Sequence, residues 1–134
     1  MDREGRLRFM RVSDKTGPLL RDFWKLVEPK LPVILDAFYA HAAGVPQLAT
    51  MVGNQIPRLK AAQGSHWARL FSGTFDDTYM QGVRTIGLTH SRIGLDPRWY
   101  IGGYLLVLNM LAEIATTNYR NAQKAAEVIG ATNT

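Results

Sequence analysis

The sequence predicts an all-α single domain over residues 1–134, and two observations carry that prediction. Apolar residues recur at steps of three and four along nearly the whole chain, which is the period of an amphipathic helix, and no segment shows the alternation of a half-buried strand. Proline, glycine and capping residues divide this pattern into about six helical segments. A chain of 134 residues with 46% hydrophobic residues is long enough to bury one core. Helix-bundle and globin-type packing both satisfy these observations.

Four of the expected helices lie in the first half of the chain. One begins after residues 13–16, and its apolar face consists of Leu20, Phe23, Trp24 and Val27. A second spans about 32–43 and stops at Gly44. A short helix over 46–52 and a longer one over 55–71 follow, each closed by a glycine. The stripe of the longer helix is Ile56, Leu59, Gln63, His66 and Leu70.

Two further helices and a weaker one complete the chain. Thr74-Phe75-Asp76-Asp77 resembles a capping box and predicts a helix that ends at Gly94. Asp96-Pro97 combines an N-cap acid with proline at the first helical position, so it predicts the start of the most apolar helix. We expect residues 119–134 to form a partial last helix, and residues 1–13 to form an arm or a short extra helix.

Composition excludes several classes of protein. The chain has no cysteine, which removes disulfides, iron–sulfur clusters, thiolate-bound haem, cysteine zinc sites and a cysteine nucleophile. The net charge of +5 is not gathered on a basic face, so we expect no nucleic-acid partner. No P-loop, G-x-S-x-G or H-E-x-x-H motif occurs. Without an uninterrupted run of about 18 apolar residues or a signal-like N-terminus, we expect a cytoplasmic protein with no membrane span.

The three histidines have different settings. His41 lies near the end of its helix, where a cation is favoured. His66 and His90 lie on apolar stripes, where each is either a core histidine with satisfied nitrogens or a metal ligand, and spacing alone favours the first. Zinc would need a third ligand, and none lies at a recognised spacing. Ser65 cannot serve His66 as a nucleophile because neighbours in a helix face different directions.

Tyr39 and Gln63 raise a related question, because both lie on largely apolar helix faces. Each is either a satisfied core residue or a polar group presented to something between the helices. A lone histidine on an apolar stripe, with these two groups and many large apolar side chains, suits a flat apolar cofactor. Haem fits that description, although composition alone does not establish it.

One segment carries a family resemblance. Thr89-His90-Ser91-Arg92-Ile93-Gly94-Leu95-Asp96-Pro97-Arg98-Trp99-Tyr100 resembles the proximal-histidine signature of the globin-coupled sensors, with a histidine, a glycine stop, a proline restart and an aromatic pair in fixed register. The segment 34–39, which ends in Phe-Tyr, resembles the second-helix motif of that family. Residues 58–67, 70–73 and 76–77 resemble its distal helix and the following turn. The resemblance covers about residues 19–115.

The resemblance implies a globin fold that binds haem b without a covalent bond. By motif position, His90 is the proximal ligand of the haem iron, and Tyr39 is the distal tyrosine whose hydroxyl donates to the gas ligand. Tyr100 is similar to the proximal-side tyrosine of the family. The other residues expected to contact the cofactor are Phe38, Leu59, Ala62, Gln63, His66, Leu70, Ile86, Ile93 and Tyr104. Where some members carry a second distal hydroxyl, this chain has Ala62 beside Gln63, so Tyr39 is the only direct donor or Gln63 substitutes.

The resemblance also implies partners. O2 is the expected ligand, with CO and NO as further gases, and the last two helices of relatives build a homodimer interface. Relatives carry a covalently linked output domain for chemotaxis, for cyclic-di-GMP synthesis or for histidine-kinase signalling. The chain is therefore predicted to be a non-catalytic oxygen-sensing input domain. The alternatives are a haem globin that carries gas or turns over NO or peroxide, and a haem-free helical interaction module, against which His90 argues.

Overall fold

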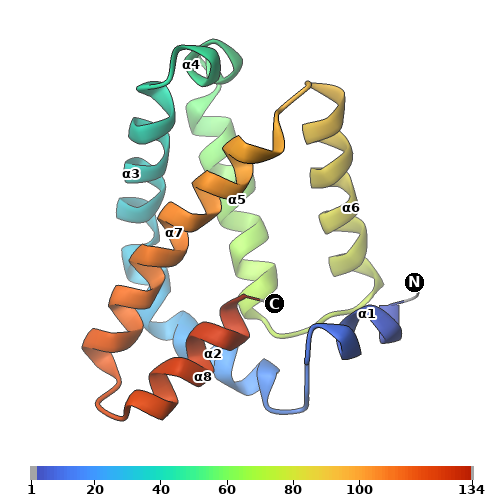
Figure 1. Ribbon diagram of the computed structural model, residues 1–134, viewed down its shortest axis with the longest axis vertical. Helices are drawn as coiled ribbons and strands as arrows, with labels where there is room; N and C mark the ends of the chain where they lie inside the picture. The colour runs from blue at the N-terminus through green and yellow to red at the C-terminus, as the bar shows by residue number, and fades with distance from the viewer. Residues whose placement is uncertain (1–2, 134) are drawn as a thin grey trace.

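The computed structural model describes residues 3–133, and within that range it contains eight α-helices, one 3-10 helix and no strand (Figure 1). The all-α prediction is confirmed. The elements in chain order are α1 (Arg3–Phe9), α2 (Thr16–Val27), the 3-10 helix η1 (Glu28–Lys30), α3 (Leu31–Ala43), α4 (Pro46–Val52), α5 (Ile56–Phe71), α6 (Asp77–Arg92), α7 (Pro97–Asn118) and α8 (Ala122–Thr132).

The core forms where α2 meets α5, α7 and α8. Leu20, Phe23 and Val27, three of the four residues of the predicted α2 face, are fully buried. The ring of Phe23 meets Phe71 of α5 edge-on with centroids 5.9 Å apart, and Trp24 stacks on Phe71 at 5.2 Å. The remaining buried residues of this cluster are Ile34, Leu35, Trp67, Leu70, Val107, Leu111, Ile114, Ala115, Val128 and Ala131. One face of each of these helices therefore fills a single core.

The helices are arranged unevenly around this core. Figure 1 shows α3 and α5 rising from the end of the molecule formed by α2 and α8, with α7 slanting across and α6 at the opposite side from α3. None of the residues of α6 is buried. The helix that carries His90 is thus the long helix that shares least in the core.

The predicted helix stops and starts agree with the structure, with one correction. Gly94, where a helix was expected to end, has a positive φ of 72°, and Asp96 caps α7 by accepting from the Arg98 N–H at 3.0 Å. The capping box expected at Thr74 is wrong: the N-cap of α6 is Asp76, whose carboxylate accepts from the Tyr79 N–H at 2.9 Å. Thr74 still belongs to the preceding turn, where its N–H donates to the Ser72 hydroxyl.

The expectation that no segment is apolar enough to cross a membrane also needs correction. By length and composition α7 qualifies, with 22 residues and a window of mean hydropathy 1.2 of which 22% is buried. The expectation was based on uninterrupted apolar runs, whereas the mean hydropathy of α7 stays high even though Gly102, Gly103 and Asn109 interrupt its apolar residues. Val107, Leu111 and Ile114 of α7 pack into the core, so α7 is part of the helical domain.

Gly17 and Gly73 meet where α2 begins and α5 has ended. A Cβ at Gly73 would lie 2.6 Å from the Gly17 Cα, and the φ of Gly73 is 73°. Arg21 secures the same junction by donating to the Ser72 carbonyl at 3.0 Å. Only glycine meets both the steric and the conformational demand at position 73.

Gly73→Ala is therefore expected to lower the free energy of unfolding by about 2–4 kcal/mol, from left-handed strain and overpacking together. Urea denaturation measures it. Gly130→Ala is the control, because a Cβ there meets nothing within 4 Å, and it is expected to stabilise α8 by up to about 1 kcal/mol. Equal midpoints for the two variants would contradict the close approach.

Candidate functional site

Tyr39 and Gln63, which the sequence singled out separately, are hydrogen-bonded to each other. The Tyr39 hydroxyl of α3 donates to Gln63 Oε1 of α5 at 2.8 Å. Tyr39 is buried, with 8% of its surface exposed, and burial raises the pKa of its phenol. The hydroxyl therefore keeps its proton at neutral pH and remains a hydrogen-bond donor.

His90 lies in the last turn of α6 and faces α7. Its ring stacks on that of Tyr100, with centroids 5.2 Å apart and an interplanar angle of 15°. Burial lowers the pKa of His90, which favours the neutral imidazole. A neutral imidazole is the form that binds a metal. Among residues 3–133, the His90 side chain makes no hydrogen bond or ion pair, so its nitrogens are available.

The first turns of α7 connect these two groups. Tyr100 touches His90, and three residues later Gly103 lies against Phe38, the neighbour of Tyr39 in the chain. The rings of Phe38 and Tyr39 meet edge-on, with centroids 4.9 Å apart. The proximal and distal candidates predicted from the sequence therefore converge on one segment of one helix.

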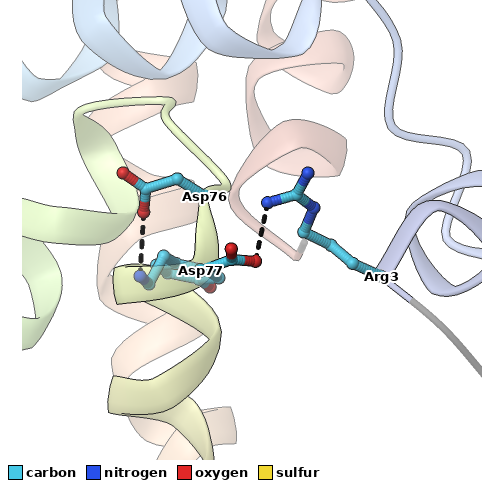
Figure 2. Close-up of polar contacts among 4 residues, drawn as sticks. Arg3, Asp76 and Asp77 are labelled. Atoms are coloured by element: carbon cyan, nitrogen blue, oxygen red, sulfur yellow. Dashed lines mark hydrogen bonds and ion pairs between the residues drawn. The ribbon is translucent and has the colours of Figure 1, made fainter.

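The opposite end of α6 is fixed at several points. Figure 2 shows two of them: the Asp76 carboxylate caps the first turn, and Arg3 of α1 forms an ion pair with Asp77 at 2.9 Å. Nearby, Tyr79 stacks on His66 of α5 at 6.3 Å. His90 follows Tyr79 by eleven residues, or about 16 Å along a helix axis. The His90 end of α6 is thus far from the contacts that hold its start.

His66 does not behave as a satisfied core histidine. Its Nδ1 is buried without a hydrogen-bond partner among the described residues, and so is Trp67 Nε1. Burial lowers the pKa of His66, and the nearby Arg69 lowers it further. His66 packs against Tyr79 near the start of α6, whereas His90 packs against Tyr100 at its end, so the two histidines contact opposite ends of this helix.

The other predicted contact residues differ in their surroundings. Leu70 belongs to the main core, and the Tyr104 hydroxyl donates to Asn133 Oδ1 at 2.7 Å, toward the end of α8. Ala62 is exposed. Leu59 and Ile86 are half-buried, and 48% of the surface of Ile93 is exposed. Sequence reasoning did not assign a role to Tyr79 as the partner of His66 or to Gly103 as the partner of Phe38, although the paired glycines in an apolar helix signalled close packing.

A hollow of about 350 Å³ lies elsewhere, between the start of α3 and the middle of α5. Its lining residues are Glu28, Leu31, Pro32, Leu35, Asp36, Lys60 and Ala61. None of the predicted site residues lines it. The candidate site at His90 and Tyr39 is therefore identified by its side-chain chemistry and not by this hollow.

The sequence profile of the Protoglobin family matches residues 2–134. The chain belongs to the protoglobin family. The recognition of a sensor-type globin from the segment around His90 is confirmed.

Two relatives define the similarity more closely. The protoglobin chain is 28% identical over 102 residues to the Heme-based aerotactic transducer HemAT of Halobacterium salinarum (strain ATCC 700922 / JCM 11081 / NRC-1). That match covers 74% of this chain and 21% of the transducer, so this chain spans about a fifth of its curated relative. The globin domain of a Geobacter sulfurreducens globin-coupled sensor superposes with a TM-score of 0.87 at 22% identity, over 95% of this chain and 85% of that domain. The globin fold is confirmed.

The residues of the site fit the group that a globin implies. Haem requires a neutral imidazole, and His90 is held in that form with free nitrogens. It also requires apolar walls, and the apolar side chains of α6 are only partly covered by the other helices. Tyr39 and Gln63 supply the few polar groups that a gas-binding face needs. We find no residue in this set that opposes haem.

The lowered pKa of His66 makes the free energy of unfolding depend on pH. Because the folded state lowers the pKa of His66 below its ordinary value of 6.5, the unfolded chain takes up the proton first as pH falls. The stabilisation is complete above about pH 6.5 and is lost below it. Tyr79 of α6 and Arg69 of α5 face the ring, and Arg69 opposes its protonation.

We expect His66→Gln to flatten the fall in unfolding free energy between about pH 7 and about pH 5. Urea denaturation at a series of pH values measures the slope. His41→Gln, at an exposed position of α3, is the matched control and should keep the slope of the parent chain. An unchanged slope in His66→Gln would show that this ring titrates as freely as in the unfolded chain.

Proposed function

We propose that this chain is a haem-based oxygen-sensing domain and the input module of a signalling protein. The observation that carries the proposal is the convergence on α7: Tyr100 stacks on His90, and Gly103 contacts the neighbour of a buried tyrosine donor. A polar pair and a neutral imidazole, linked through the start of α7 by aromatic rings and a glycine, suit a gas ligand better than a larger polar substrate. Membership of the protoglobin family supports the same reading.

The cofactor in this proposal is haem b, held through the imidazole of His90. When bound, haem would supply an iron that the His90 imidazole holds and that binds diatomic gases. The stacked ring of Tyr100 restricts the rotation of the His90 side chain. The buried phenol of Tyr39 has one proton, which Gln63 Oε1 accepts here, so Tyr39 donates to the gas by turning from Gln63 toward it; the amide of Gln63 retains two N–H groups as a second donor.

The same donor discriminates between gases. O2 draws more electron density than CO when it binds, so it gains more from an O–H group nearby. Such a charge-biased hydrogen bond contributes about 1.5–3 kcal/mol, which corresponds to roughly 10- to 100-fold in affinity. Tyr39 therefore sets the preference of the site for O2, with CO and NO as further ligands.

The role in signalling rests on the relatives and on α7. The curated relative is named a heme-based aerotactic transducer, and this chain matches about a fifth of it. We propose that an output domain for chemotaxis, cyclic-di-GMP synthesis or a histidine kinase supplies any catalytic activity, in the cytoplasm. On α7, Ile101 and Leu105 lie one turn apart with 62% and 55% of their surfaces exposed, which suits a homodimer through α7 and α8.

His90→Ala is expected to abolish the spectrum of five-coordinate ferrous haem, because the chain loses its axial nitrogen. Absorption spectra of the reduced, oxygenated and CO-treated protein measure this. His41→Ala should leave all three spectra unchanged. A parent chain that stays colourless after addition of haemin would contradict the proposed function itself.

Tyr39→Phe removes the hydroxyl and its hydrogen bond to Gln63 but keeps the ring. It is expected to speed O2 dissociation by about 10- to 100-fold while changing CO dissociation much less. Stopped-flow displacement of each gas measures the two rates. Equal changes for both gases would count against Tyr39 as the donor to O2.

A further inference from the structure

Two adjacent glycines near the start of α7 have different surroundings. A Cβ built on Gly102 meets nothing within 4 Å. A Cβ built on Gly103 would lie 2.7 Å from Phe38 Cε2 and 3.2 Å from Phe38 Cζ, closer than real side chains approach. The ring of Phe38 therefore occupies the space that any other residue at position 103 would need.

Phe38 in turn packs against the ring of Tyr39. The two rings meet at 82° with centroids 4.9 Å apart, the edge-to-face arrangement that aromatic pairs prefer. Neighbouring residues of a helix point about 100° apart, so Phe38 leans on α7 while Tyr39 reaches α5. Phe38 is only half-buried, so it can move if its place against α7 is taken.

The Tyr39 hydroxyl is sensitive to such a movement. Its bond to Gln63 Oε1 is 2.8 Å long, and it is the hydrogen bond that fixes the direction of the phenol among the described residues. Hydrogen bonds weaken steeply as distance and angle depart from the optimum. A displacement of the ring that supports Tyr39 changes where its proton points.

We infer that Gly103 is a positioning residue for Tyr39: by lacking a side chain, it lets the Phe38 ring lie against α7 and hold the phenol toward Gln63. The inference about the orientation of Tyr39 stands on these contacts alone. Its consequence for gas binding rests on the proposed function. Gly103 touches neither the gas nor the iron in this role and acts through Phe38.

The test compares Gly103→Ala with Gly102→Ala in the intact chain. Both variants exchange glycine for alanine in the same turn of α7, so they share the gain in helix propensity, and they differ in the contact with Phe38. The chain is labelled with ¹³Cζ-tyrosine, and NMR of the haem-free protein reports the hydrogen bonding of each phenol. Tyr39→Phe assigns the Tyr39 signal, and Gln63→Leu gives its position when the bond to Gln63 is absent.

We expect Gly103→Ala to move the Tyr39 signal toward its position in Gln63→Leu, and Gly102→Ala to leave it in place. A Tyr39 signal unchanged in a folded Gly103→Ala variant overturns the inference. If Gly103→Ala does not fold, Phe38→Leu replaces it, since loss of the ring removes the same support. An unmoved Tyr39 signal in Phe38→Leu overturns the inference equally.

The haem-loaded protein provides the second measurement. Gly103→Ala is expected to raise the ratio of O2 to CO dissociation rates by about 2- to 10-fold, less than Tyr39→Phe, because the phenol that exchanges between Gln63 and the gas is displaced rather than removed. Gly102→Ala should keep the ratio of the parent chain. If the Tyr39 signal of Gly103→Ala moves but its ratio of O2 to CO dissociation rates does not, the inferred consequence for gas binding is overturned. Failure of the chain to take up haem would instead overturn the proposed function and leave the NMR comparison to decide the inference.

Discussion

The structure depends on how α6 is held. Its first turn is capped by Asp76 and paired with α1 through Asp77, and the rings of Tyr79 and His66 join it to α5. At its other end the contact is that of His90 with Tyr100. A helix fixed at its start and lightly held at its end can adjust the position of its last turn without disturbing the core, whose buried residues lie in α2, α3, α5, α7 and α8.

The first turns of α7 contact both His90 and Phe38. Tyr100 and Gly103 lie one turn apart, so a shift of α7 at this point reaches both the imidazole and the ring that supports Tyr39. Packed side chains have discrete arrangements, and small shifts are passed on through direct contacts of this kind. The same helix also presents Ile101 and Leu105 outward. One helix thus connects the two candidate faces of the site with the surface.

Much of the local structure could be read from the sequence because it depends on neighbouring residues. Asp96-Pro97 began a helix as expected, and Gly94 adopted the positive φ that ends the previous one. The start of α6 was misplaced at Thr74, because Asp76 is a second capping residue two positions later and its carboxylate accepts from the first turn of the helix. The polar setting of His66 was also beyond the sequence, since the partners available to a ring nitrogen come from other helices.

By itself the sequence determined the helical class, the positions of the glycine and proline breaks, and the family motif around His90, because these depend on periodicity and on short motifs. Only the tertiary structure decided that the Tyr39 hydroxyl donates to Gln63 and that His66 packs near the start of α6. It also decided which of the two adjacent glycines of α7 lies against the Phe38 ring. These are contacts between side chains far apart in the chain, and the angle at which α3, α5, α6 and α7 cross fixes them.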